Sequence, residues 1–224
     1  MHRSGRPIID LEKIEEELRA LTFPLYFLDY ETFAPAIPMF SGYSPYSRIA
    51  FQFSLHVLRT RTGEPEHVEH LHEERSDPSE TIAGLLAQHI GGGTVISWNK
   101  SFEQGVNREL ANRVPAHRAA LERINAQMYD LKDIFHKQYY VHPEFRGKTS
   151  IKKVLPALVA GVRHADLNIK EGGQASEAWW QMISPVTSAA ERQKISKDFR
   201  TYCELDTYAM YQIWKHLHDL ISDS

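Results

Sequence analysis

The chain has 224 residues, of which 42% are hydrophobic and 25% are charged, and its formal net charge is −3. This composition excludes an intrinsically disordered or collagen-like chain, and a folded chain of this length buries roughly 70% of its unfolded surface. Because positive and negative charges nearly balance, any nucleic-acid site must be a local basic surface or one that uses metal ions. No apolar run approaches the roughly 18 residues of a membrane span.

Cysteine usage limits both the compartment and the metal chemistry. The chain has one cysteine, Cys203, which has no partner for an internal disulfide. A thiolate-rich zinc or iron–sulfur site is therefore excluded. Residues 1–7 are polar and do not resemble a secretory signal, so we expect a cytoplasmic protein.

The first part of the chain predicts a helix and three strands. Asp10 is a suitable N-cap for a helix whose apolar residues recur at helical spacing before Pro24. Residues 34–48 contain three prolines and are expected to form a long loop. Strands are expected at residues 25–32, 49–59 and 66–73.

The rest of the chain predicts one further strand among helices. Asp77, Pro78 and Glu80 are typical of a helix start, and the glycines at 91–93 end that helix. A short buried strand is expected at 94–98 and a loop at 171–175. Further helices are expected at residues 102–114, 116–126, 129–140, 151–159, 177–182 and 189–221. This order predicts an α/β fold with a mixed β-sheet flanked by helices.

Two acidic residues lie close together on the first of these strands. Asp29 and Glu31 are two residues apart, so their side chains share one face of a strand that otherwise looks buried on both faces. Burying like charges without compensation is costly. Carboxylate oxygens suit magnesium or manganese, which would offset the charge. Pairing with an arginine or with loop amides at a sheet edge is the alternative, and both interpretations remain open.

A second acidic position lies on the last helix. Asp206 falls within an otherwise apolar helical stripe, with Tyr202 one turn earlier on the same side. A carboxylate at such a position faces either a metal or a buried base. The pairing of a tyrosine with an aspartate on a core-facing stripe is the more unusual feature.

A third acidic position follows the strand at 94–98. Glu103 lies in the first turn of the next helix, where the helix dipole favours a carboxylate. Taken alone, Glu103 is explained by this effect, with Asn99 or Ser101 as the cap. Asp130 is the other acid nearby, and we expect it to be a helix cap.

Together, these three positions resemble the motifs of the DEDD exonucleases, tyrosine subclass, of the ribonuclease H-like superfamily. Asp29-Tyr30-Glu31 matches the D-x-E motif of the first strand, and the segment from Tyr202 to Asp206 matches Y-x-x-x-D on a late helix. The segment from Asn99 to Glu103 matches the second motif, with Glu where the family usually has Asp. The resemblance covers about residues 25–217. More narrowly, the chain resembles an uncharacterised bacterial domain family often found as the C-terminal part of longer chains.

This resemblance implies a single ribonuclease H-like exonuclease domain over residues 25–224, with a helix from residues 1–24 packed on it. It implies 3′–5′ hydrolysis of DNA or RNA with two Mg²⁺ or Mn²⁺ ions about 4 Å apart. Asp29 would bridge both ions, Glu31 and Asp206 would hold the first, and Glu103 would hold the second directly or through water. Tyr202 would orient the attacking water, because a phenol with a pKa near 10 is a weak base at neutral pH.

A nucleic acid, entering as single-stranded ends, is the partner that the resemblance implies. The expected substrate-binding residues are Asn99, Phe102, Phe33, Lys152 and Lys153. The two lysines begin a helix, where phosphate binds favourably, but a solvated charged surface explains them equally well. Phe33 begins an aromatic-rich loop, where aromatics stack on bases or anchor the loop to the core.

Two other functions remain open at this stage. The first is a catalytically silent ribonuclease H-like module that binds nucleic acid or a partner, such as other domains of a longer chain. The substitution of Glu103 for the usual aspartate favours it. The second is a structural α/β domain whose acids are caps and ion pairs, and it predicts that Asp29 and Glu31 point away from Asp206.

Overall fold

The structure is a computed structural model that describes residues 6–159 and 172–222. Its main sheet has five strands: β2 (Leu25–Phe33), β3 (Ile49–Leu58), β4 (Glu66–Leu71), β5 (Thr94–Ser97) and β6 (Met128–Asp130). The strand order is β4-β3-β2-β5-β6, with β2, β3 and β4 antiparallel and β5 and β6 parallel to β2. The expected α/β fold with a mixed sheet is therefore confirmed.

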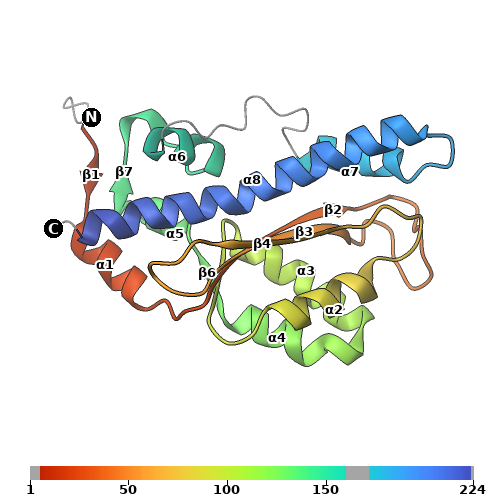
Figure 1. The fold of residues 1–224 in the computed structure, drawn as a ribbon, viewed down its shortest axis with the longest axis horizontal. Coiled ribbons are helices and arrows are strands. Elements are labelled where there is room, and N and C mark those ends of the chain that lie inside the picture. Colours follow the sequence, from red (N-terminus) through yellow and green to blue (C-terminus); the bar gives the residue numbers. More distant parts are fainter. Residues whose placement is uncertain (1–5, 160–171, 223–224) are drawn as a thin grey trace.

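Helices cover both faces of this sheet. Those described are α1 (Leu11–Arg19), α2 (Ser79–His89), α3 (Lys100–Arg113), α4 (Arg118–Ala126), α5 (Asp133–His136), α6 (Ile151–Leu158), α7 (Gly172–Met182) and α8 (Ala189–Ser222). Helix α8 runs the length of the molecule over one face, whereas α2, α3 and α4 lie under the other (Figure 1). Within the described residues, no helix is both long and apolar enough to cross a bilayer.

The alternation of β2 divides the apolar core in two. Leu25 and Phe27 face α8 and pack with α1, α5 and α6, while Tyr26, Leu28 and Tyr30 face α2, α3 and α4. A strand buried on both faces reads as a nearly continuous apolar run, as the sequence 25–28 does. Any polar side chain on β2 is therefore enclosed by a helical layer.

The approach of β5 to β2 depends on one glycine. Gly93 has φ +127°, and a Cβ atom at this position would lie 2.3 Å from the carbonyl oxygen of Pro24. Only glycine fits such a close approach in this backbone conformation. Gly93 thus allows β5 to lie directly beside β2, and α3, which follows β5, begins near the acidic end of β2.

Two predicted segments are wrong. Residues 129–140 do not form one helix, because residues 128–130 pair with β5 as β6 and a short strand, β7 (Tyr140–Val141), follows α5. Strand β7 pairs with β1 (Ile8–Ile9) in a separate two-stranded sheet. Residues 172–175 are the first turn of α7 rather than a loop, and the rest of that predicted loop lies outside the described residues.

The predicted N-terminal helix is present as α1. The Asp10 side chain caps it, because its Oδ1 accepts a hydrogen bond from the Lys13 amide at 3.1 Å. Ile14 and Leu18 are buried against α8 in the core. The helix thus packs on the larger α/β unit.

Candidate metal centre

The acidic residues of β2 lie on the face that α8 covers. Asp29 and Glu31 alternate with Tyr30, whose hydroxyl donates a hydrogen bond to Asn107 Oδ1 at 2.6 Å on the opposite face. Across the strand pair, Asp29 lies beside Ser54 and Glu31 beside Gln52. Four polar residues thus share a face that α8 shields from solvent.

Helix α8 brings the third carboxylate to this face. Ligand oxygens of Asp29, Glu31 and Asp206 all lie within 4.8 Å of one another. Asp206 and Tyr202 are buried on the helix side that meets the sheet. A structural domain whose acids were caps and ion pairs would keep these carboxylates apart, so this geometry does not meet the expectation of that alternative.

Glu103, in the first turn of α3, is the fourth acidic residue near this group of carboxylates. It is 3% exposed, and its Oε2 accepts no hydrogen bond from any described residue. The start of α3 is held instead by Asp130, whose carboxylate accepts hydrogen bonds from the amides of Lys100 and Lys132 at 3.0 and 3.1 Å. Asp130 is therefore committed to capping, and Glu103 is left with an unpaired carboxylate oxygen.

These residues line one pocket with a volume of about 620 Å³. It contains all five predicted catalytic residues and three of the predicted substrate-binding residues, namely Asp29, Glu31, Glu103, Tyr202, Asp206, Asn99, Phe102 and Lys152. Glu103 shares this pocket but lies outside the tight group of three carboxylates. The pocket thus has an acidic floor formed by β2 and α8, with Glu103 at its α3 side.

The pocket environment opposes ionisation of its acids. Burial raises the pKa of Glu31 to about 8, and the negative charge of Asp206 adds to this effect, whereas Lys152 acts in the opposite direction. Burial and then the charge of Asp206 hold the pKa of Asp29 well above its usual range. Burial raises the pKa of Glu103 to about 8. Such a cluster is unfavourable when fully ionised, unless cations enter it.

Lys152 and Tyr202 line the acidic pocket and contact each other. The ammonium Nζ of Lys152 donates a hydrogen bond to the Tyr202 hydroxyl at 3.4 Å and lies 5.3 Å from the centre of its ring. Burial, followed by the charges of Asp206 and the β2 acids, raises the pKa of Tyr202. The hydroxyl therefore keeps its proton at neutral pH.

The donor set fits hard divalent cations. Asp29, Glu31 and Asp206 offer close carboxylate oxygens, and Glu103 offers a buried oxygen with no described hydrogen-bond donor. Magnesium and manganese prefer such oxygen ligands. The arginine in the pocket, Arg48, is bound at 2.6 Å to Glu109 rather than to the acidic floor.

Two predicted substrate-binding residues lie outside this pocket. Phe33 is two residues beyond Glu31, but its ring packs on α7, where it stacks on Trp180 at 5.9 Å. Lys153 is exposed on α6, because consecutive helical residues point about 100° apart.

Several pocket residues were not predicted from the sequence. They are Tyr30, Thr32, Ala34, Arg48, Trp98, Ile151, Gly173, Ser176 and Met210. Ser176 donates to the Thr32 carbonyl at 2.9 Å and so ties α7 to the end of β2. Tyr30 falls within the D-x-E motif and Met210 lies one turn after Asp206 on the last helix, so the sequence carries a signal for these two. Loop closure and helix crossing bring the others together, and no periodicity or motif marks them.

A second pocket adjoins the acidic one. It has a volume of about 620 Å³ and is lined mostly by apolar loop residues together with Phe33, Arg75 and Trp180. Ala34 lines both pockets, so the two are adjacent at this residue. Trp180 is 43% exposed, and the Arg75 guanidinium lies 5.4 Å from the centre of its ring. An exposed aromatic surface therefore lies next to the carboxylates.

The fold and site define an α/β protein with a buried carboxylate pocket between its sheet and its last helix. The family described as "Domain of unknown function (DUF2779)" matches residues 26–150, more than half of the chain, and the chain belongs to this family. "Uncharacterized protein UU173" of Ureaplasma parvum serovar 3 is 29% identical in a match of length 145 that covers 58% of this chain and 21% of that protein. The match thus spans about a fifth of that relative's length. No solved structure matches the chain.

Proposed function

We propose that this protein is a metal-dependent 3′–5′ exonuclease with a ribonuclease H-like fold, of the DEDD tyrosine subclass. The observation that carries the proposal is the approach of Asp206 to Asp29 and Glu31 within 4.8 Å, although about 175 residues separate them in sequence. Caps and surface ion pairs do not require such an approach. The motif order also agrees, because D-x-E lies on the first strand of the main sheet and Y-x-x-x-D on a late helix that covers it.

Charge balance supports two divalent cations as the cofactors. Asp29, Glu31 and Asp206 would hold the first, with Asp29 shared, and Glu103 would contribute to the second. Four carboxylates match the charge of two such ions. When bound, the cations lower the pKa of water and offset negative charge on a phosphate.

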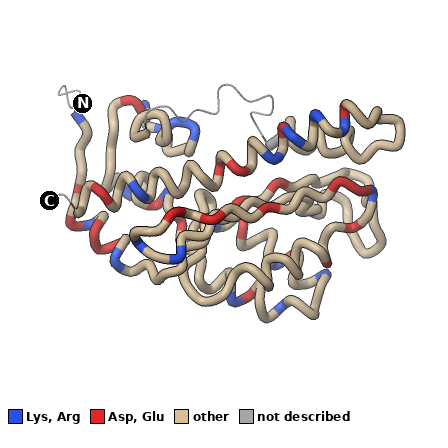
Figure 2. Tube along the Cα trace, viewed as in Figure 1, with Lys and Arg blue, Asp and Glu red and all other residues tan. Residues whose placement is uncertain are grey.

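Tyr202 and Lys152 would position the nucleophile and the phosphate. Tyr202 keeps its proton, so its hydroxyl acts through hydrogen bonding and orients a nucleophile rather than deprotonating it. Lys152 places a positive charge beside Tyr202, where it can hold a phosphate oxygen. Lys and Arg positions gather at the start of α6 (Figure 2), the helix that carries Lys152.

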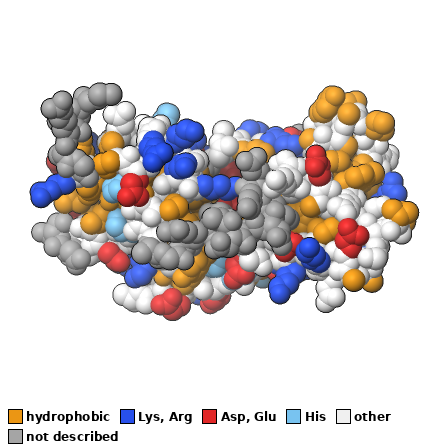
Figure 3. Space-filling view, turned by 90° about the horizontal axis from the view of Figure 1, so that it is seen from above, with side chains coloured by type: hydrophobic (Ala, Val, Ile, Leu, Met, Phe, Trp, Pro, Cys, Tyr) orange, Lys and Arg blue, Asp and Glu red, His pale blue; other side chains and the backbone are white. Residues whose placement is uncertain are grey.

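The surface around the pocket suits an unpaired strand. Lys and Arg side chains are spread over the face seen in Figure 3, and hydrophobic side chains are most numerous toward the end away from the two termini. Cationic groups attract the phosphate backbone, and exposed aromatic rings stack on bases regardless of sequence. Trp180 with Arg75 is the aromatic surface that adjoins the acidic pocket.

An end-labelling assay with manganese tests this function. Single-stranded DNA and RNA carrying a 5′ label should shorten progressively, whereas a 3′ label should be released as a mononucleotide. A covalently closed circle of the same sequence should resist. Glu122→Gln, which removes an exposed carboxylate on α4, is the matched control and should remain active. Cleavage of the circle, or equal degradation by Asp206→Asn, would contradict the proposal.

The second candidate, a silent nucleic-acid-binding module, is favoured by the placement of Glu103. Its carboxylate lies outside the tight group of three, where the resembled family has an aspartate that is one methylene shorter. This alternative predicts salt-sensitive oligonucleotide binding with no hydrolysis at any divalent-ion concentration.

Truncating the exposed aromatic surface should weaken substrate binding without removing chemistry. For Trp180→Ala, we expect KM for single-stranded substrate to rise roughly 10-fold with little change in kcat, because stacking on one base is worth about 1–3 kcal/mol. Steady-state kinetics with a fluorescent oligonucleotide measure this split. Tyr46→Ala is the control, since Tyr46 is 72% exposed and lines neither pocket. A fall in kcat with KM unchanged would assign Trp180 another role.

A further inference from the structure

Strand β3 carries a row of buried polar residues on an otherwise apolar strand. Gln52, Ser54 and His56 are spaced by two, so all three side chains point to the face that α8 covers. They are 0%, 0% and 4% exposed. Buried polar groups require partners, and three in register indicate a specific arrangement rather than ordinary packing.

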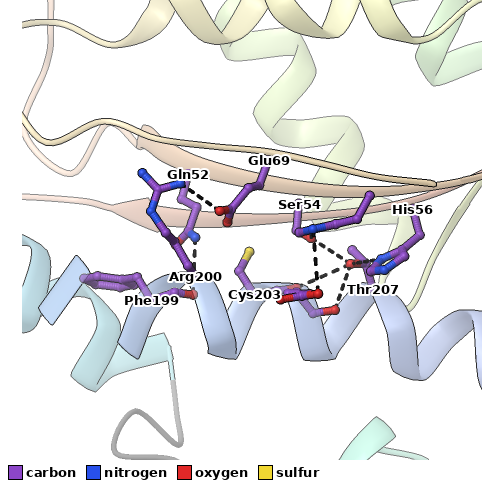
Figure 4. Close-up of polar contacts among 10 residues, drawn as sticks. Gln52, Ser54, His56, Glu69, Phe199, Arg200, Cys203 and Thr207 are labelled. Carbon is purple, nitrogen blue, oxygen red and sulfur yellow. Dashed lines mark hydrogen bonds and ion pairs between the residues drawn. The ribbon is translucent and has the colours of Figure 1, made fainter. Parts of the chain in front are cut away.

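Helix α8 provides these partners (Figure 4). The Thr207 hydroxyl lies 2.7 Å from Ser54 Oγ and 2.8 Å from His56 Nδ1. About two turns earlier, Gln52 Nε2 donates to the Phe199 carbonyl at 3.3 Å. The polar row of β3 therefore contacts α8 at two places along its length.

One proton assignment satisfies the bonds around Thr207. Its hydroxyl donates to the Glu204 carbonyl at 3.1 Å and accepts from both Ser54 and His56. Burial, followed by the charge of nearby His67, lowers the pKa of His56 to about 4, so at neutral pH its ring is uncharged and one nitrogen donates. Ser54 Oγ in turn accepts from His67 Nε2 at 2.9 Å. The Thr207 hydroxyl is thus the centre of the network.

A hydrolase triad formed by Ser54, His67 and Glu204 is the other interpretation of these contacts. Ser54 is 0% exposed and lines neither the acidic pocket nor the second pocket beside it, so no substrate reaches its hydroxyl. The gap of 3.8 Å between His67 Nδ1 and Glu204 Oε1 also exceeds a hydrogen bond. The network therefore acts on the fold rather than on a substrate.

Thr207 directly follows Asp206. Elsewhere α8 contacts the sheet through apolar side chains and through Arg200, whose guanidinium binds Glu69 at 2.7 Å and Glu73 at 3.0 Å. The hydrogen bonds from Thr207 to β3 lie next to Asp206 in the helix, and because hydrogen bonds are directional they orient this part of α8. Because Ser54 lies beside Asp29 across the strand pair, the same bonds place Asp206 against the β2 acids.

We propose that Ser54, His56 and Thr207 are positioning residues that hold Asp206 in register with Asp29 and Glu31. This inference rests on the proposed metal site. The partners that orient metal ligands affect affinity strongly, and losing one typically costs 10–100-fold in metal binding.

Two substitutions at Thr207 distinguish an effect on the position of Asp206 from an effect on the stability of the fold. Thr207→Val keeps the shape and removes the hydroxyl, and we expect manganese to bind about 10-fold more weakly. Thr207→Ser keeps the hydroxyl and should restore affinity to within about 3-fold of the wild type. Manganese binding is measured by calorimetry and by the electron paramagnetic resonance of free Mn²⁺, well below the melting temperature of each variant.

Ile82→Val is the control. It should lower the free energy of unfolding by about as much as Thr207→Val, through the core on the opposite face of the sheet, and should not alter manganese affinity. Ser54→Ala replaces Thr207→Val if the latter does not fold, and the same loss of affinity is expected. Equal binding by Thr207→Val and the wild type would overturn this inference alone, as would equal weakening by Ile82→Val. A wild-type chain that binds no manganese would overturn the proposed function together with it.

Discussion

Replacing Asp29 by asparagine should abolish manganese-dependent hydrolysis of single-stranded oligonucleotides while raising the melting temperature of the metal-free chain. Lewis-acid stabilisation by a bound metal is worth several kcal/mol, and about 1.4 kcal/mol corresponds to a tenfold change in rate, so we expect a loss of about 1,000-fold or more in kcat. Asparagine has nearly the same shape but carries no charge. It therefore removes both the desolvation cost that burial imposes on an ionised carboxylate and the repulsion from Asp206 and Glu31.

The opposite signs of these two effects make the result specific. A residue needed only for folding would lower activity and stability together, whereas Asp29→Asn should lower activity and raise stability. Single-turnover cleavage and thermal melts with a chelator measure the two quantities. Glu122→Gln should change neither, because this carboxylate is exposed on α4. Activity within 10-fold of the wild type would contradict a metal-ligand role for Asp29.

The acidic pair of β2 and the tyrosine–aspartate pair of α8 could be predicted from the sequence, because each depends on local periodicity. A spacing of two puts Asp29 and Glu31 on one strand face, and a spacing of four puts Tyr202 and Asp206 on one helix face. Their convergence depends on α8 crossing β2, and local pattern does not fix that crossing. The motif resemblance predicted it, and the carboxylates do lie together.

Other features depend on tertiary contacts that leave a weak trace in the sequence. Strand β6 has only three residues, and its pairing with β5 overrides the local preference that favoured a helix over residues 129–140. Phe33 packs against Trp179 and Trp180 of α7 instead of lining the acidic pocket, and no sequence pattern signals this contact. The polar row of β3 does leave a signal, since Gln52, Ser54 and His56 alternate within the apolar strand IAFQFSLHVL.

The metal-free chain should lose stability as the pH rises from 6.5 to 8. The pKa values of Glu31 and Glu103 are raised to about 8 in the folded chain, whereas ordinary glutamate in the unfolded chain titrates near 4.5. Between these values the folded state binds more protons than the unfolded state, so the free energy of unfolding falls as the pH rises. This contribution is fully present below about pH 4.5 and is lost as the pH passes through about 8.

Manganese should reverse this loss, and more strongly at pH 7.5 than at pH 6, because ligands must give up their protons to bind a metal. At about 100 times its Kd, a ligand adds roughly 2.7 kcal/mol. In a chain of this length that corresponds to a rise of roughly 5–10 °C in melting temperature.

His56 affects the pH dependence in the opposite direction. Because its pKa is lowered to about 4, it makes stability rise with pH below about pH 6.5. Comparing thermal melts of Glu31→Gln with those of the wild type removes the His56 contribution, because both chains retain His56. The variant should show a flatter pH dependence between 6.5 and 8 and little stabilisation by manganese. A wild-type pH profile that matched the variant would show that Glu31 is ionised without metal, and that the pocket does not need cations to offset its charge.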